Sequence, residues 1–185
     1  MPTRFALRTA ALPAMACAAL LAACAGMPVP FSQDGLPDAV RVPAGHRVAM
    51  ETVGSGEITY ECKAKANAPA EFEWAFVGPQ AALKSRMGTT VGKYYGPPAT
   101  WESADGSKIT GAQLAVAPAG AGNIALQLVK ANPAMGSGAM SGISHVQRLA
   151  TRGGVAPNLP CGGGMAGQRQ VVAYQADYVF WKPAM

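Results

Sequence analysis

The sequence has few charged residues, and they are not grouped. Asp, Glu, Lys and Arg make up 14% of the 185 residues, and the formal net charge at pH 7 is +5. No run of Lys or Arg appears, whereas surfaces that bind nucleic acid concentrate these residues on one face. We therefore expect no nucleic-acid partner.

The sequence also lacks the short motifs of several enzyme classes. It has no G-x-S-x-G elbow of a serine hydrolase. Its glycine clusters, Gly136–Ser141 and Gly162–Gly164, lack the third glycine or the lysine that a dinucleotide or phosphate site needs. No Cys-x-x-Cys pair occurs, and only His46 and His145 are available to assist a metal site. We predict no catalytic residue, no cofactor and no metal.

No apolar run is long enough to make a transmembrane helix. The apolar stretch 10–23 is interrupted by Pro13 and is shorter than the roughly 20 residues that a span requires. It follows Arg4 and Arg8, and this order of charged, apolar and small residues is typical of a secretory signal. Residues 1–23 are therefore predicted to be a signal peptide.

The end of this segment, Leu21-Ala22-Ala23-Cys24, resembles the lipobox of bacterial lipoproteins. The resemblance implies cleavage before Cys24, lipidation of Cys24 and attachment to the membrane through this lipid anchor. Ala25 stands where lipoproteins retained in the inner membrane have Asp, so the resemblance implies an outer-membrane anchor facing the periplasm. The alternative is an ordinary cleaved signal in which Cys24 is incidental. In both cases the protein is exported, and the lipoprotein resemblance implies that it stays in the cell envelope.

Four cysteines are present, at positions 17, 24, 62 and 161. The first lies in the predicted signal and the second is predicted to carry lipid, which leaves Cys62 and Cys161. Two remaining thiols in an oxidising compartment are typically joined. We therefore predict a disulfide between Cys62 and Cys161, with two separate buried thiols as the alternative.

The mature chain is predicted to consist of a lipidated tether, residues 24–41, and a single β domain, residues 42–185. The tether is rich in proline and has no periodicity. Beyond it, segments of alternating apolar and polar residues are separated by turn residues, which is typical of antiparallel strands. Strands are expected at 47–53, 57–63, 71–77, 91–95, 100–103, 108–116, 123–130, 143–151 and 171–182.

Three connections carry specific expectations. Gly54-Ser55-Gly56 is predicted to be a hairpin turn between the first two strands, and Asp105-Gly106 a second hairpin turn. Ala81–Arg86 is expected to form one helical turn. No stretch shows sustained helical periodicity. The predicted fold is therefore all-β, an antiparallel sandwich or barrel of about nine short strands.

A series of segments along the β domain is similar to a known family. In chain order they are Val42-Pro43-Ala44-Gly45, Ile58-Thr59-Tyr60-Glu61-Cys62, Trp74-Ala75-Phe76, Val91-Gly92-Lys93-Tyr94-Tyr95-Gly96-Pro97, Thr100-Trp101-Glu102, Asp105-Gly106-Ser107, Val146-Gln147-Arg148, Gly153-Gly154-Val155-Ala156-Pro157, Cys161 and Ala176-Asp177-Tyr178. Together they resemble the bacterial and fungal domain-of-unknown-function family numbered 3455, from about Val42 to Lys182. The resemblance implies a secreted or periplasmic β-rich domain and no established activity. The family often has His where this chain has Tyr94, so no role of that His is transferred.

The segment from Lys93 to Glu102 has the composition of a binding surface. Aromatic rings contact a ligand with their faces while a few polar groups fix its orientation. The candidate ligand-binding residues are Lys93, Tyr94, Tyr95, Trp101 and Glu102, with Gln147 and Arg148 as partners if a pocket forms. The alternative is that Tyr95 and Trp101 are core residues on adjacent strands and that Glu102 faces solvent.

These observations predict a cell-envelope lipoprotein with a binding or structural role, whose expected ligand is a glycan or an envelope protein. The alternative is an envelope enzyme that acts on a carbohydrate or small molecule, with Glu102 or Asp177 as acid or base. Glycoside hydrolysis needs two carboxylates across one cleft, and the chain has only ten acidic residues. We therefore favour the binding or structural role.

Overall fold

The structure is a computed structural model that describes residues 30–184. The predicted signal peptide and the predicted lipidation site, Cys24, lie outside the described residues. The chain divides into two units, Met1–Pro30 and Phe31–Met185, and the second contains all of the strands described. Among residues 30–184, no helix has the length and apolar character needed to cross a membrane.

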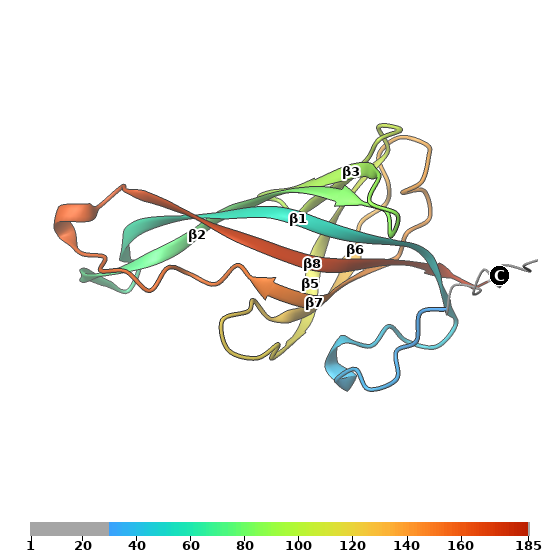
Figure 1. The fold of residues 1–185 in the computed structure, drawn as a ribbon, viewed down its shortest axis with the longest axis horizontal. Coiled ribbons are helices and arrows are strands. Elements are labelled where there is room, and N and C mark those ends of the chain that lie inside the picture. The colour runs from blue at the N-terminus through green and yellow to red at the C-terminus, as the bar shows by residue number, and fades with distance from the viewer. Residues whose placement is uncertain (1–29, 185) are drawn as a thin grey trace, which may run out of the picture. The chain divides into compact units, whose positions relative to one another are not determined.

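Eight strands form one closed antiparallel barrel (Figure 1). They are β1 (His46–Lys65), β2 (Ala68–Lys84), β3 (Thr90–Tyr95), β4 (Thr100–Ser103), β5 (Lys108–Ala117), β6 (Leu126–Ala131), β7 (His145–Gly153) and β8 (Arg169–Pro183). Each strand pairs with the next along the chain, and β8 pairs with β1 to close the ring. Two short 3-10 turns, η1 (Asp38–Val40) and η2 (Gly163–Met165), precede β1 and β8. The predicted all-β class is confirmed.

The first two predicted strands are one strand, so the prediction of a hairpin at Gly54-Ser55-Gly56 is wrong. β1 runs through these residues and pairs with β2 on one side and with β8 on the other. A Cβ atom at Gly54 would lie 2.5 Å from the Tyr178 ring, and one at Gly56 would overlap the Gln80 carbonyl oxygen. The two glycines therefore permit close packing inside the sheet.

The predicted helical turn at Ala81–Arg86 is also wrong, because residues 81–84 continue β2. Ala81 and Leu83 are buried in the core, whereas Lys84 is exposed. Alanine and leucine favour helices in isolation, but here their side chains alternate across a sheet and fill its inner face. The hairpin at Asp105-Gly106 was predicted correctly and connects β4 with β5.

Aromatic side chains fill the middle of the barrel. The Tyr94 ring stacks on Trp101 with 4.8 Å between the ring centroids, and the Tyr178 centroid lies 5.1 Å from Tyr94 and 6.0 Å from Trp101. Trp101 is 1% exposed and Tyr178 is 0% exposed. Aromatic pairs at these separations stabilise the fold beyond the area that they bury. We call Tyr94, Trp101 and Tyr178 the aromatic floor.

The β6–β7 loop, residues 132–144, covers one end of the barrel. Met140 and Ile143 of this loop are buried in the same core cluster as the aromatic floor. Asp105 in the β4–β5 turn holds the loop, because its carboxylate accepts hydrogen bonds from the Ser107 hydroxyl at 2.6 Å and the Ala139 N–H at 2.7 Å. These bonds lower the pKa of Asp105 to about 2. The carboxylate is therefore charged and bonded at neutral pH.

Residues 31–42 pack on the outer side of the barrel. Val40 and Val42 belong to a core cluster with side chains of β6, β7 and β8, and Phe31 contacts Trp181 edge to face at 5.8 Å. We call residues 31–42 the strap. Residues 31–41 are thus part of the folded unit and not of a free tether as predicted.

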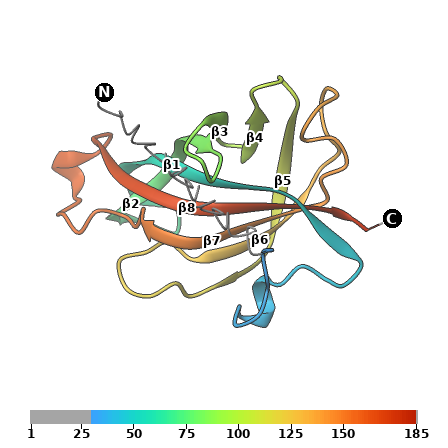
Figure 2. The same cartoon turned by 45° about the vertical axis from the view of Figure 1, so that its right-hand side comes forward.

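β1, β2 and β8 extend beyond the other strands as a three-stranded projection (Figures 1 and 2). The loop before β8, residues 154–168, is fixed to this projection. Trp74 Nε1 donates a hydrogen bond to the Leu159 carbonyl at 3.0 Å, and Cys62 of β1 forms a disulfide with Cys161. The predicted disulfide is confirmed.

Replacing both Cys62 and Cys161 with Ala should lower the free energy of unfolding by about 2–5 kcal/mol. The bond links residues 99 positions apart, and without it the unfolded chain gains entropy and the 154–168 loop loses its attachment to β1. Denaturant unfolding of the purified chain with and without reductant measures the difference. Identical unfolding midpoints in the two conditions would show that the disulfide does not stabilise the barrel.

Replacing Trp101 with Ala should cost about 3–5 kcal/mol, because it removes a fully buried indole from the aromatic floor. Tyr95→Ala on the outer face of the neighbouring strand is the matched control and should cost about 1 kcal/mol or less. Thermal melts of the two variants make the comparison. Equal losses would mean that Trp101 does not have the core position described.

Candidate functional site

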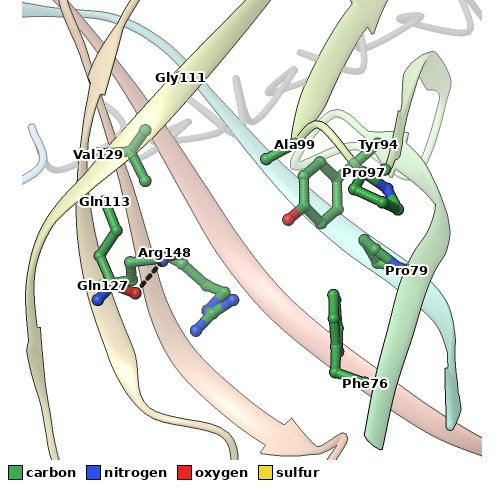
Figure 3. A pocket seen from close by; sticks show the side chains of 11 residues that line it. Phe76, Pro79, Tyr94, Pro97, Ala99, Gly111, Gln113, Gln127, Val129 and Arg148 are labelled. Atoms are coloured by element: carbon green, nitrogen blue, oxygen red, sulfur yellow. Dashed lines mark hydrogen bonds between the residues drawn. The ribbon is translucent and has the colours of Figure 1, made fainter. Parts of the chain in front are cut away.

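The end of the barrel opposite the β6–β7 loop is open and holds a cavity of about 310 Å³ (Figure 3). The course of β4 shows that these are opposite ends of the barrel. The β3–β4 turn at one end of this strand borders the cavity. The β4–β5 turn at its other end contacts the β6–β7 loop. The cavity is lined by Phe76, Pro79, Tyr94, Gly96, Pro97, Ala99, Gly111, Gln113, Gln127, Val129 and Arg148. This volume is at the lower end of the range for small-molecule sites.

An apolar wall and a polar wall face each other across the cavity (Figure 3). The apolar wall consists of Phe76, Pro79, Pro97 and Ala99, and the polar wall of Gln113, Gln127 and Arg148. Phe76 is 56% exposed although it is aromatic. The hydroxyl end of Tyr94 points from the aromatic floor toward the polar wall (Figure 3).

Two local features of the sequence leave this space open. The β3–β4 pairing ends at Tyr95 and Thr100, because the prolines of the turn between them have no N–H to continue the ladder. The turn therefore carries Pro97 to the edge of the cavity. On β5, a Cβ atom at Gly111 would lie 2.5 Å from Cγ1 of Val129, so this part of the wall is bare backbone.

Arg148 is the charged residue of the polar wall. It lies on β7, opposite Gln127 of β6 and Tyr178 of β8. Its Nε and Nη2 atoms donate hydrogen bonds to the Ala125 carbonyl at 3.2 and 2.9 Å. A guanidinium has five N–H donors, so three have no hydrogen-bond partner within residues 30–184.

The charge of Arg148 has no counter-charge among residues 30–184. All ten carboxylate side chains lie among the described residues, and none forms an ion pair with Arg148. Arg86, in contrast, lies 2.8 Å from Glu51 and 2.9 Å from Asp177. The residues that line the cavity include no acid. The cavity therefore carries one uncompensated positive charge.

The tyrosines near Arg148 are neutral at physiological pH. Burial raises the pKa of Tyr94, Tyr174 and Tyr178, and the nearby positive charge of Arg148 acts in the opposite direction on each pKa. The Tyr174 and Tyr178 hydroxyl oxygens are 3.3 Å apart. A neutral phenol both donates and accepts hydrogen bonds, so Tyr94 offers the cavity a hydroxyl donor.

The structure brings three of the predicted ligand-binding residues into the barrel interior. Tyr94 and Arg148 line the cavity, and Trp101 lies against Tyr94 in the aromatic floor. Trp101 does not reach the cavity and is almost completely buried. Its position is that of a core residue, as the alternative interpretation of this side chain stated.

Lys93, Tyr95 and Glu102 lie on the outer face of β3 and β4. The Tyr95 hydroxyl donates to Glu102 Oε2 at 2.7 Å, and Lys93 Nζ lies 3.2 Å from Glu102 Oε1. The bond from Tyr95, and then that from Lys93, lower the pKa of Glu102. The three side chains satisfy one another on the outer surface, where Lys93 and Glu102 line an open hollow. The alternative in which Tyr95 is a core residue is therefore wrong for this side chain.

Gln147 is fully buried, but on the outer side of β7 beneath the strap. Its Nε2 donates to Gln33 Oε1 at 2.9 Å and to the Val40 carbonyl at 2.6 Å. Its Oε1 accepts from Trp181 Nε1 at 2.8 Å. Both the nitrogen and the oxygen of the Gln147 amide are hydrogen-bonded between the strap and the barrel. Gln147 therefore does not contact the cavity.

Sequence reasoning missed Phe76, Pro79, Gln113 and Gln127 as residues of the cavity. A signal for Gln113 was present, since strand alternation places it on the same face as the buried Ile109. A polar residue on the inner face of a strand marks a place where the interior is not fully packed. The alternation alone does not show which strands bring such residues together.

Within residues 30–184, no group of three or more His, Cys, Asp or Glu side chains is placed to hold a metal ion. His46 and His145 lie edge to face with 4.8 Å between their ring centroids. Neither lines the cavity.

The family described as "Protein of unknown function (DUF3455)" matches this chain over residues 43–182. No curated protein and no solved structure matches. The matched range contains every residue that lines the cavity.

Proposed function

The chain belongs to the DUF3455 family, whose function is unknown, and we propose that it is an exported lipoprotein of the cell envelope that binds a small ligand in its barrel. The location is predicted from the N-terminal sequence, and the candidate binding site is the cavity in the barrel interior.

The main support for a binding role is the cavity, which has an apolar wall on one side and a polar wall on the other. An eight-stranded barrel has an interior wide enough either to be filled by side chains or to hold one small ligand. Here the aromatic floor fills one part, and the remaining part has an apolar wall facing Gln113, Gln127 and Arg148. Small-molecule sites typically combine apolar walls with a few polar groups that fix orientation. The exposed Phe76 offers a large apolar surface to such a ligand.

The disulfide and the N-terminal sequence support the exported location. Disulfides form and persist in oxidising compartments outside the cytoplasm, and Cys62 is joined to Cys161. Leu21-Ala22-Ala23-Cys24 supports a lipid anchor on Cys24, and Ala25 supports an outer-membrane location in which the protein faces the periplasm.

The lipid anchor would hold the barrel close to the membrane. The strap begins at Phe31, which is seven positions after Cys24. Seven fully extended residues span at most about 25 Å. The partners of the protein are then the membrane, through this anchor, and a ligand that reaches the barrel near the membrane surface. The size of the cavity favours a small molecule over a whole glycan chain or an envelope protein.

The alternative, an envelope enzyme acting on a carbohydrate or small molecule, has less support. Glycoside hydrolysis by a pair of carboxylates needs both acids at one cleft. No acidic residue lines the described cavity. Glu102 is bonded to Tyr95 on the outer surface, and Asp177 is paired with Arg86. Neither acid is placed to reach a ligand in the cavity.

Replacing Cys24 with Ser should release the protein from the membrane fraction, because it removes the thiol that carries the lipid. Fractionation of cells and labelling with a fatty acid measure the two consequences. Cys62→Ser is the control and should remain in the membrane fraction. A Cys24→Ser protein that stays membrane-bound, with a wild type that takes up no fatty acid, would contradict the lipid anchor.

Replacing Ala99 with Phe should fill the cavity from its apolar wall and abolish ligand binding. Cinnamate and cinnamamide, aromatic probes of suitable size, are tested by thermal denaturation of the purified full chain. A probe at 100 times its Kd should stabilise the wild type by about 2.7 kcal/mol. Ala112→Phe, on the exposed outer face of β5 next to Gly111, should keep this stabilisation. If neither probe stabilises the wild type, or if Ala99→Phe is stabilised equally, the cavity is not the binding site.

A further inference from the structure

We propose that the ligand is an organic monocarboxylate, with its carboxylate paired to Arg148 and its apolar body against Phe76, Pro79 and Pro97. This inference rests on the proposed function and specifies the chemical class of the ligand.

The guanidinium of Arg148 is held in one orientation before any ligand binds. Its Nε and Nη2 both donate to the Ala125 carbonyl. The residue before Ala125 is fixed to β7 twice: the Ile124 N–H donates to the Gly153 carbonyl at 3.0 Å, and the Thr151 hydroxyl donates to the Ile124 carbonyl at 2.6 Å. Because the edge formed by Nε and Nη2 is engaged, one N–H of Nη1 and the remaining N–H of Nη2 form a free edge of two parallel donors.

A free guanidinium edge is the geometry that a carboxylate recognises. Two parallel N–H donors on adjacent nitrogens bind both oxygens of a carboxylate, and such charge-assisted pairs are stronger than neutral hydrogen bonds. Leaving a partly buried charge without a partner is unfavourable. A bound carboxylate would supply the counter-charge that none of the ten acidic side chains of the chain provides.

The neighbouring amides add neutral donors to the same wall. Gln127 Nε2 donates to Gln113 Oε1 at 2.7 Å, which leaves the Gln113 NH₂ group free to donate. The Tyr94 hydroxyl points into the cavity from the aromatic floor (Figure 3). An acceptor with two oxygens can therefore bind Arg148 and a second donor together.

The number of charged residues that line the cavity indicates the charge of the ligand. Arg148 is the one charged residue among those that line the described cavity. A phosphate, with close to two negative charges, is usually held by several cations or by a helix N-terminus, and no such arrangement lines this cavity. One cation with neutral amides fits a monoanion.

The opposite wall determines the rest of the ligand. Phe76, Pro79, Pro97 and Ala99 offer flat apolar surface without hydrogen-bond donors or acceptors in their side chains. A ring or a short branched hydrocarbon packs on such a surface. The expected ligand is therefore amphipathic, with the carboxylate and the hydrocarbon on opposite sides.

The test compares cinnamate with cinnamamide, which differ in charge but hardly in shape, by isothermal titration calorimetry on the purified full chain. Wild type should bind cinnamate about 10- to 100-fold more tightly than cinnamamide, since a hydrogen bond to a charged group contributes more than a neutral one. Acetate, which has the carboxylate without the apolar body, should bind more weakly than cinnamate.

Two variants locate the effect at Arg148. Arg148→Met should remove the preference for cinnamate over cinnamamide, whereas Arg152→Met, an exposed arginine on the same strand, should keep it. Gln127→Glu provides a second test if Arg148→Met does not fold. Residue 127 is directly opposite Arg148, so a carboxylate there should pair with the guanidinium and weaken the binding of cinnamate more than that of cinnamamide.

The outcomes separate this inference from the proposed function. Equal affinity of the wild type for cinnamate and cinnamamide, with binding abolished by Ala99→Phe, would overturn the carboxylate inference and leave the cavity as the binding site. A cinnamate preference that persists in Arg148→Met or Gln127→Glu would also overturn it. Absence of binding by both probes would overturn both proposals.

Discussion

The pairing of β1 with β8 is the interaction on which the rest of the structure depends. It joins residues 46–61, near the start of the folded unit, to residues 169–183 at its end. Gly54 permits this pairing because the Tyr178 ring occupies the space of its missing side chain. Once the ring is closed, alternate side chains of eight strands point into a single interior. The core, the aromatic floor and the cavity all result from this closure, since none of them lies on one pair of strands.

The interior is divided by the sizes of the residues that point into it. Tyr94, Trp101 and Tyr178 occupy the middle, and Met140 of the β6–β7 loop fills the space toward the covered end. Toward the open end, Gln113, Gln127 and Arg148 face Phe76 and Pro79 across the cavity, and bare backbone at Gly111 forms part of the wall. Protein cores are usually packed to high density, whereas this end of the barrel holds a cavity of about 310 Å³.

The alternation of residues was sufficient to predict the all-β class, the β4–β5 hairpin and most strand positions, and export with two remaining thiols was sufficient to predict Cys62–Cys161. The continuity of β1 was not predictable, because Gly54-Ser55-Gly56 is a typical turn sequence and its glycines have a role only once Tyr178 is beside them. The candidate site was predicted in part. Consecutive residues of a strand lie on opposite faces, so Tyr94 and Arg148 enter the cavity while Lys93, Tyr95 and Gln147 do not. Gln113 and Gln127 were not found, because their proximity depends on the barrel register.

The choice of amides beside Arg148 is informative about what the cavity is built to do. Gln127 is the direct cross-strand neighbour of Arg148 on the inner face, and side chains in such positions are close enough to interact. Glutamate has almost the same shape as glutamine, and at position 127 it would neutralise the guanidinium with a carboxylate of the protein itself. Elsewhere this chain makes such pairs, as Arg169 does with Glu61 at 2.8 Å. In the cavity it has glutamines, which preserve hydrogen bonding and leave the positive charge available. A glutamate at position 127 would neutralise the charge of Arg148 within the protein. The glutamine leaves that charge unpaired, so the polar wall is better explained by an anionic partner from outside the chain.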